Sequence, residues 1–157
     1  MLRHRLDLLS SASQNVIVLS SLDIMENPVG GENIRLVIES PLRLLRGGSE
    51  LRRFDFSAFL RSQMRRCSSL FAYYGDGELD IDFAGLSGEA SLVKCLDDGI
   101  RYSQPHWSLR PNHAGLIGIS RFAGVTPGIL SLLTLGAYIN AGKLASFGFG
   151  AYVTEAG

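Results

Sequence analysis

Residues 141–152, with the sequence Ala-Gly-Lys-Leu-Ala-Ser-Phe-Gly-Phe-Gly-Ala-Tyr, lie between two apolar segments of the chain. The glycines of this stretch allow backbone conformations and close approaches that a side chain would prevent. Lys143 and Ser146 add a charge and a hydroxyl to the same loop, which could present backbone N–H groups to an anion. A turn that only lets the last strand pack tightly explains the spacing equally well. The three glycines are Gly142, Gly148 and Gly150.

The segments on either side of this loop predict a helix and a strand. Thr126 and Pro127 form a helix start, because a hydroxyl cap is followed by proline at the first helical position. Residues 129–139 are apolar nearly all round, which predicts a helix buried against a sheet. After the loop, residues 147–153 are predicted to form the last strand.

Another helix is predicted in the first half of the chain. Asp55 has the side chain of an N-cap, and Gly75 is a fitting stop. Arg61, Arg65 and Ser68 fall on a different side from the apolar stripe. The stripe recurs at three- and four-residue intervals and consists of Phe56, Phe59, Leu60, Met64, Cys67, Leu70 and Phe71.

Three further segments have the composition of strands. Residues 34–40 are rich in β-branched side chains and predict a strand. Pro41 interrupts it, and a continuation over residues 42–45 is compatible only with a sheet edge. Gly47-Gly48 closes this unit. The second strand is residues 99–104 and the third is residues 114–122, where two glycines permit close packing or a bulge.

The remaining segments are less regular. Residues 76–92 alternate acidic and apolar side chains, which indicates either a short strand or a linker. Residues 105–113 form a polar, aromatic hairpin region. The first part of the chain suggests a short amphipathic turn at 2–9, a strand at 16–19 and a turn at 27–31.

From residue 33 the predicted order is strand, helix, strand, strand, helix, strand. This order predicts an α+β, ferredoxin-like (βαββαβ) fold, with an antiparallel sheet backed by two helices. We therefore divide the chain into a ferredoxin-like domain, residues 33–157, and an N-terminal part, residues 1–32. That part is an appendage or the remnant of a preceding repeat. Many unrelated functions use this fold, so the fold alone does not give the function.

Composition limits the class of protein. Among 157 residues, 46% are hydrophobic and 19% charged, which excludes a disordered chain. No run is long enough to span a bilayer, and residues 1–9 lack a signal-peptide core, so we expect a cytoplasmic protein. Cys67 and Cys95 lie far apart without metal-ligand spacing, which favours buried free thiols in a reducing compartment.

Charge is balanced overall but unevenly placed. The chain has 15 basic and 15 acidic residues, whereas a non-specific nucleic-acid-binding protein is usually more basic. Seven arginines lie between Arg43 and Arg66, and seven acids lie between Asp76 and Asp98. This asymmetry predicts either one positive face or two solvated surfaces.

Two ligand-binding motifs are excluded by their spacing. A phosphate-binding P-loop ending at Gly142-Lys143 would need glycine at 137 and serine or threonine at 144, where Ala137 and Leu144 stand. A calcium loop starting at Asp76 would need glycine and glutamate where Ile81 and Ser87 stand. We therefore expect no cofactor and no metal.

The histidines are the candidates for acid–base chemistry. His4, His106 and His113 show no paired spacing with another metal ligand. His106 and His113 flank the hairpin region that also contains Arg110, and Arg101 lies shortly before it. Acid–base cleavage of RNA suits a group that titrates near neutral pH, as histidine does, but two surface histidines explain the pattern as well.

The closing run, residues 132–150, resembles the C-terminal glycine-rich motif of CRISPR-associated RAMP proteins. It is most similar to the endoribonuclease branch that cuts precursor CRISPR RNA, in which a leucine-rich helix ends in Gly-Lys before Ser-Phe-Gly and Gly-x-Gly. Other pieces match in the same order: Ile38-Glu-Ser-Pro-Leu-Arg-Leu44, the 56–71 helix with Arg65-Arg66, Tyr102-Ser103, and Gly115-Leu-Ile-Gly118.

The resemblance covers about residues 33–153 and implies binding of CRISPR repeat hairpin RNA. It implies metal-independent cleavage, in which the RNA 2′-hydroxyl attacks the adjacent phosphate while His113 or His106 acts as acid or base. Family members carry their usual catalytic histidine in an N-terminal repeat, which implies a separate N-terminal RAMP partner. The predicted RNA-binding residues are Gly142, Lys143, Ser146, Gly148, Gly150, Arg101, Arg110, Arg43 and Arg46.

Two alternatives stay open. The chain could be a non-catalytic RAMP subunit that binds RNA or docks among CRISPR effector subunits. It could also be a ferredoxin-like domain without an RNA role, in which the glycine loop serves packing alone.

Overall fold

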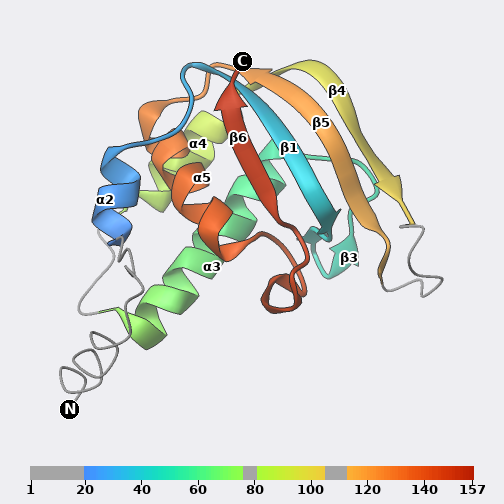
Figure 1. Cartoon of the computed structure of the whole chain (residues 1–157), viewed down its shortest axis with the longest axis horizontal. Coiled ribbons are helices and arrows are strands. Elements are labelled where there is room, and N and C mark those ends of the chain that lie inside the picture. The colour runs from blue at the N-terminus through green and yellow to red at the C-terminus, as the bar shows by residue number, and fades with distance from the viewer. Residues whose placement is uncertain (1–19, 76–80, 105–112) are drawn as a thin grey trace, which may run out of the picture.

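The structure is a computed structural model that describes residues 20–75, 81–104 and 113–157. A four-stranded sheet with the order β4-β5-β1-β6 forms its centre, and every neighbouring pair is antiparallel. The predicted βαββαβ order and ferredoxin-like fold are confirmed (Figure 1). The core elements are β1 (Asn33–Leu42), α3 (Phe56–Tyr74), β4 (Lys94–Ser103), β5 (Gly115–Ala123), α5 (Pro127–Ile139) and β6 (Tyr152–Ala156).

Both predicted helices start and end at their capping residues. Asp55 accepts a hydrogen bond from the Ala58 N–H at 2.7 Å, which satisfies one of the unpaired donors of the first turn of α3. Gly75 ends this helix and donates its N–H to the Phe71 carbonyl at 2.7 Å. In α5, the Thr126 hydroxyl caps the Ile129 N–H at 3.4 Å.

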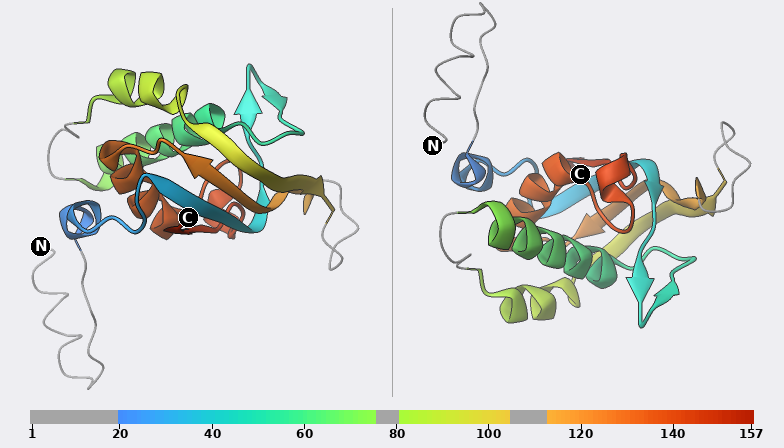
Figure 2. Two further views of the ribbon diagram at one scale, coloured as in Figure 1. Left: turned by 90° about the horizontal axis from the view of Figure 1, so that it is seen from above. Right: turned by 90° about the horizontal axis from the view of Figure 1, so that it is seen from below.

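The helices cover one face of the sheet, as the two end-on views show (Figure 2). Alternating residues of β1 point into this layer: Ile34, Leu36 and Ile38 are buried. Phe59 of α3 stacks edge-on against Tyr152 of β6, with ring centroids 5.0 Å apart. The apolar stripe of α3 therefore packs directly on the sheet.

The chain leaves the sheet after β1. The pairing of β1 with β5 shifts in register between Ile38 and Leu42, around Pro41, which has no N–H to donate. β1 runs through Pro41 to Leu42, so the predicted continuation over residues 42–45 is right for Leu42 and wrong for residues 43–45. Instead, β2 (Leu45–Arg46) and β3 (Ser49–Glu50) form a separate two-stranded hairpin around Gly47-Gly48.

Residues 83–90 form a helix, which corrects the prediction of a strand or linker over residues 76–92. In α4 (Phe83–Ala90), the Asp82 carboxylate caps the helix by accepting from the Gly85 N–H at 2.9 Å. Phe83 and Leu86 pack against the core, and Ala90 is buried. Tertiary packing therefore stabilises a short helix that has weak helix propensity. Residues 76–80 lie outside the described residues.

A short helix precedes the sheet. In α2 (Ser21–Glu26), Ser20 and Asp23 form a reciprocal capping box. The Met25 carbonyl accepts from the Ser131 hydroxyl at 2.8 Å, and Val29 donates its N–H to the Thr134 hydroxyl at 3.0 Å. These bonds attach residues 25–29 to α5. The elements predicted at 2–9 and 16–19 lie outside the described residues.

The last strand begins later than predicted. Residues 145–147 form the 3₁₀ helix η2 (Ala145–Phe147), and the two glycines that follow adopt left-handed backbone angles, so the strand cannot begin at residue 147.

The prediction for the cysteines is half right. Cys67 is buried, whereas Cys95 is exposed because it lies on the edge strand β4. None of the described helices combines the length and apolarity needed to span a bilayer.

Candidate functional site

The glycine loop, residues 140–151, is fixed by backbone bonds to the end of β1. Gly150 donates its N–H to the Pro41 carbonyl at 3.1 Å, and Lys143 donates to the Arg43 carbonyl at 2.9 Å. The two ends of the loop also meet, because the Ala141 N–H donates to the Gly150 carbonyl at 2.9 Å. The loop therefore folds onto the point where β1 leaves the sheet.

The glycine N–H groups are used inside the protein. Gly142 donates to the Ser62 hydroxyl at 3.2 Å, and Gly148 donates to the Ala145 carbonyl at 3.1 Å. Together with the bond from Gly150, these contacts show that the prediction of exposed backbone donors at the three glycines is wrong. The packing explanation of the glycines therefore holds for the loop backbone.

Close approach explains why two of these positions need glycine. Gly142 has a φ of +74°, and a Cβ there would lie 2.5 Å from the Arg43 carbonyl oxygen. Gly150 has a φ of +66°, and a Cβ there would lie 2.0 Å from the Ala141 carbonyl oxygen. Both distances are shorter than a contact between non-bonded atoms allows.

Side chains between the loop and α3 surround a groove of about 520 Å³, which we call the basic groove. Four of its lining residues are cationic: Arg43, Arg65, Arg66 and Lys143. None of the described lining residues is acidic. The structure thus brings the predicted residues Arg43, Lys143 and Gly142 together, and it adds two arginines of α3. The other lining residues are Leu45, Ser62, Ser69, Leu70, Tyr73 and Tyr74.

One stripe of α3 makes the helix wall of the groove. Ser62, Arg65, Arg66, Ser69 and Tyr73 follow one another at three- and four-residue steps, so they lie on the same face of the helix. This face lies beside the apolar stripe that contacts the sheet, and Leu70 of that stripe also lines the groove. The spacing was visible in the sequence as a second, polar periodicity, which is the signal that could have identified these residues.

The four cations differ in their contacts. Arg66 donates its Nε–H to the Ile139 carbonyl at 2.6 Å, at the C-terminal end of α5. The guanidinium of Arg43 makes a double contact with Glu50, at 3.1 Å from Nε to Oε1 and 2.8 Å from Nη2 to Oε2. Within the described residues, Arg65 and Lys143 take part in no ion pair, so their charges face the groove without a carboxylate.

Glu50 joins the β2–β3 hairpin to β4. Its Oε1 accepts the Tyr102 hydroxyl at 3.2 Å, and the guanidinium of Arg52 lies 3.9 Å from the centre of the Tyr102 ring. The hydrogen bond from Arg43 lowers the pKa of Glu50, although burial acts in the opposite direction. This cluster holds Arg43 and the hairpin at the rim of the groove.

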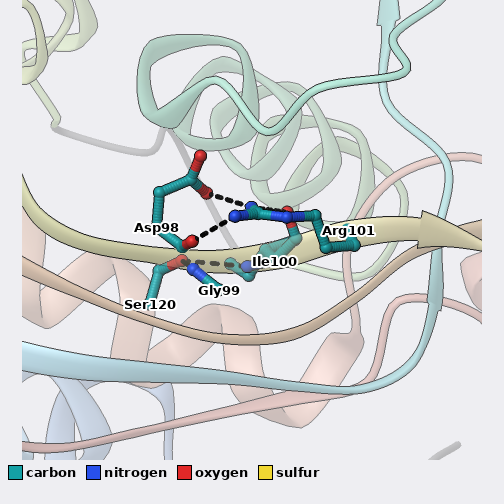
Figure 3. A network of polar contacts seen from close by, with 5 residues as sticks. All are labelled: Asp98, Gly99, Ile100, Arg101 and Ser120. Atoms are coloured by element: carbon teal, nitrogen blue, oxygen red, sulfur yellow. Dashed lines mark hydrogen bonds and ion pairs between the residues drawn. The ribbon is translucent and has the colours of Figure 1, made fainter.

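Two predicted RNA-binding arginines are bound elsewhere. Arg46 forms an ion pair with Asp55, the cap of α3, at 2.8 Å. Arg101 lies along its own strand and contacts the Asp98 carboxylate at 2.9 Å and the Asp98 carbonyl at 2.6 Å (Figure 3). Neither arginine is among the residues that line the basic groove.

The surroundings of Arg101 are held by a buried serine. The Ser120 hydroxyl accepts the N–H groups of Gly99 and Ile100 at 3.0 Å and 3.2 Å (Figure 3). These bonds tie β4 to β5 beyond the regular ladder. Arg101 is therefore part of a strand-stabilising network at the edge of the sheet.

The remaining predicted site residues lie around the loop or outside the described residues. His113 lies two residues before β5, with its ring edge-on to Phe149 and 5.7 Å between centroids, but it does not line the basic groove. Ser146 is exposed in η2. His106 and Arg110 lie outside the described residues. Among the described residues, no group of three His, Cys, Asp or Glu side chains could hold a metal ion.

Comparisons with solved structures show what this fold is similar to. A Cas6 product complex has a TM-score of 0.63 and 19% identity, over 87% of this chain and 58% of that chain. Thermus thermophilus Cas6 has a TM-score of 0.64 and 14% identity, over 87% and 58%. A Cas6-RT-Cas1–Cas2 complex has a TM-score of 0.67 and 15% identity, over 92% and 17%.

The chain spans a little over half the length of the first two of these Cas6 structures, and at such low identity the likeness shows the fold alone. No curated protein matches the sequence. The sequence itself matches the model of the CRISPR-associated endoribonuclease Cas6 family over residues 36–152. Because this match extends over most of the chain, the protein belongs to the Cas6 family of CRISPR-associated endoribonucleases.

Proposed function

We propose that this chain is the RNA-binding, ferredoxin-like part of a Cas6-type endoribonuclease that processes precursor CRISPR RNA. The observation that carries the proposal is the basic groove, where four cations meet and none of the described lining residues is acidic. In this proposal the groove binds phosphates of the repeat RNA.

The chemistry of the lining residues suits phosphate. A guanidinium offers paired donors to phosphate oxygens, and an ammonium acts as a point charge. Arg65 and Lys143 both line the groove and take part in no ion pair among the described residues, so RNA would meet no competing carboxylate at these two side chains. Since the chain has no net charge, this attraction is local to the groove.

Cleavage in this proposal needs no metal. The RNA 2′-hydroxyl attacks the adjacent phosphorus, the bond to the 5′-oxygen breaks, and a 2′,3′-cyclic phosphate and a free 5′-hydroxyl result. A base removes the proton from the 2′-hydroxyl, an acid protonates the leaving oxygen, and cations stabilise the charged transition state. His113 and His106 are the candidates within this chain, and a separate N-terminal half is the other source of the catalytic group.

A specific observation favours the second candidate function, a subunit that holds RNA without cutting it. His113 contacts the glycine loop through Phe149 but is absent from the residues that line the basic groove. A phosphate bound by Lys143 therefore does not meet this imidazole within the groove. Such a subunit could dock among CRISPR effector proteins.

The binding proposal is tested with a labelled repeat hairpin RNA in the presence of EDTA. We expect Lys143→Gln and Arg65→Gln each to weaken binding and to reduce the slope of log affinity against log salt by about 0.7 to 0.9 per lost phosphate contact. Lys94→Gln is the matched control, because Lys94 is exposed on β4 and does not line the groove. Equal slopes for Lys143→Gln and the wild-type protein would contradict the proposal.

The same incubation separates the two candidate functions. Cleavage that survives EDTA and disappears in His113→Ala or His106→Ala would establish a self-sufficient nuclease. Binding without cleavage would favour the non-catalytic subunit or a catalytic group supplied by a separate N-terminal half.

A further inference from the structure

The C-terminal end of α3 carries two exposed tyrosines that line the basic groove. Tyr73 and Tyr74 are 83% and 84% exposed. Their ring centroids lie 6.4 Å apart with an angle of 55° between the planes. Two large exposed aromatic rings beside a cluster of cations need an explanation, because exposed aromatic surface on a soluble domain often marks a binding site.

The tyrosines continue the helix wall that begins with the cations. Tyr73 and Tyr74 follow Arg66 by two turns of α3, and both share the groove with Arg66 and Lys143. From Ser62 to Tyr73 the wall extends about 16 Å at the helical rise. Along this length its character changes from hydroxyl and cationic to aromatic.

Among the described residues, neither tyrosine takes part in the core packing. Both are absent from the hydrophobic core and from the residues packed against it. Within the described part of the chain, each ring is in ring contact only with the other, and neither hydroxyl forms a hydrogen bond. The rings therefore expose their aromatic faces, and the core formed by the described residues does not include them.

We propose that Tyr73 and Tyr74 form a stacking subsite for unpaired nucleotides of the RNA whose phosphates lie on Arg65, Arg66 and Lys143. This inference rests on the proposed function and adds the substrate class, a single-stranded segment beside the repeat hairpin. Bases of a paired stem are stacked inside the duplex, whereas unpaired bases can turn outward onto aromatic side chains. Because every base has a π face, the subsite tolerates different bases.

The test compares two RNAs, a repeat hairpin with a single-stranded flank and the same hairpin with a blunt end. For the flanked RNA, the double variant Tyr73→Ala/Tyr74→Ala should raise Kd by about 5-fold to 150-fold, which corresponds to the loss of one stacked base. The salt slope should not change, because no phosphate contact is lost. The blunt hairpin should bind the wild-type protein and the variant equally.

Three controls make the result specific. Tyr73→Phe/Tyr74→Phe keeps the aromatic faces and should bind the flanked RNA like the wild-type protein. Tyr138→Ala removes another exposed tyrosine, 64% exposed on α5 and outside the basic groove, and should change nothing. Replacing flank bases with abasic sugars should remove the difference between wild-type protein and double alanine variant, whereas exchanging one base for another should preserve it.

The failure of this inference is distinct from the failure of the proposed function. If the double alanine variant binds the flanked RNA like the wild-type protein while Lys143→Gln weakens binding, the stacking subsite is wrong and the groove proposal stands. If Lys143→Gln and Arg65→Gln both leave RNA binding unchanged, the groove proposal fails. A large fall in Tm or a change of oligomeric state in the double alanine variant would also overturn the subsite, since the rings would then serve a protein contact.

Discussion

The helix wall of the basic groove satisfies its backbone hydrogen bonds within α3. The loop wall is the glycine loop, residues 140–151, of which Gly142 and Lys143 line the groove, and it sends N–H groups to distant parts of the chain. The loop donates to the Pro41 and Arg43 carbonyls at the end of β1 and to the Ser62 hydroxyl on the helix wall. A helix presents side chains on a self-supporting backbone. The conformation of the loop, in contrast, depends on hydrogen bonds to residues that are distant in sequence.

Because of this difference, the residues that maintain the backbone and the residues that could bind RNA are distributed differently in the two walls. On the helix wall, exposed side chains can change without disturbing the backbone. On the loop wall, the glycines hold the backbone in place, and Lys143 is the exposed residue that brings a charge to the groove. Substitutions in the two walls should therefore affect stability and RNA binding in different proportions.

The largest loss of folding stability is expected for a substitution at Gly150 of the loop wall. In Gly150→Ala, the new Cβ would meet the Ala141 carbonyl oxygen at 2.0 Å at a φ of +66°. We expect a loss of about 3 kcal/mol in the free energy of unfolding, from left-handed strain plus the clash. Gly148→Ala is the matched variant, since it has a φ of +86° but no atom within 4 Å of the new Cβ. It should cost about 1 kcal/mol.

Chemical denaturation measures both variants under the same conditions. Equal losses for Gly148→Ala and Gly150→Ala would show that backbone strain alone matters, and that the close packing of the loop ends contributes little.

Sequence patterns could predict the helix wall but only part of the loop wall. Asp55, Gly75 and the apolar stripe define α3, because caps and periodicity are local properties. Lys143 lines the same groove as Arg65 and Arg66 because the loop docks beside α3, and no local sequence pattern encodes this docking. The family resemblance pointed to Lys143, but not to its neighbours in the groove.

The wrong predictions have the same physical origin. Residues 83–90 read as strand or linker, yet packing of Phe83 and Leu86 against the core stabilises α4. The backbone donors of the glycine loop were expected to bind an anion, yet their acceptors include Pro41 and Ser62, which are distant in sequence. Tertiary contacts outweigh local propensity at these places.

The second prediction concerns Arg66, which belongs to the helix wall but also supports α5. Its Nε–H donates to the Ile139 carbonyl at 2.6 Å, where the last carbonyls of α5 lack helical partners. We expect Arg66→Gln to lower the free energy of unfolding by about 1.5 kcal/mol, the scale of a hydrogen bond from a charged group. Arg65→Gln, an exposed neighbour, should stay within about 0.5 kcal/mol of the wild-type protein. Thermal denaturation of both variants is the measurement, and similar Tm values for the two would contradict the dual role of Arg66.

A hydrogen bond between Gly142 and Ser62 links the two walls directly, and the third prediction concerns its removal. Ser62→Ala removes the hydroxyl that accepts the Gly142 N–H at 3.2 Å. We expect a cost of about 1 kcal/mol, since the donor loses its acceptor inside a partly buried contact. Hydrogen exchange at the Gly142 amide should speed up, while exchange in the centre of α3 should not. Ser69→Ala is the control, because Ser69 lines the same groove and is exposed. Unchanged exchange at Gly142 would show that the walls are joined by other contacts.

The smallest effect is expected at Glu50, which supports the loop wall indirectly through Arg43. The hydrogen bond from Arg43 lowers the pKa of Glu50 in the folded protein, with burial opposing it. A lowered folded-state pKa stabilises the protein above the unfolded-state pKa, and this contribution is lost as the pH falls through the folded-state pKa. Glu50→Gln should therefore cost less than about 1 kcal/mol at pH 7, because the desolvation of this partly buried pair offsets much of its attraction. The gap between wild-type and variant stability should close as the pH falls below the ordinary pKa of glutamate.

Urea denaturation across this pH range measures the gap, and since all other acids titrate in both proteins, their effects cancel. A gap that stays constant or widens on acidification would show that Glu50 acts through its shape and its contact with Tyr102, and not through its charge.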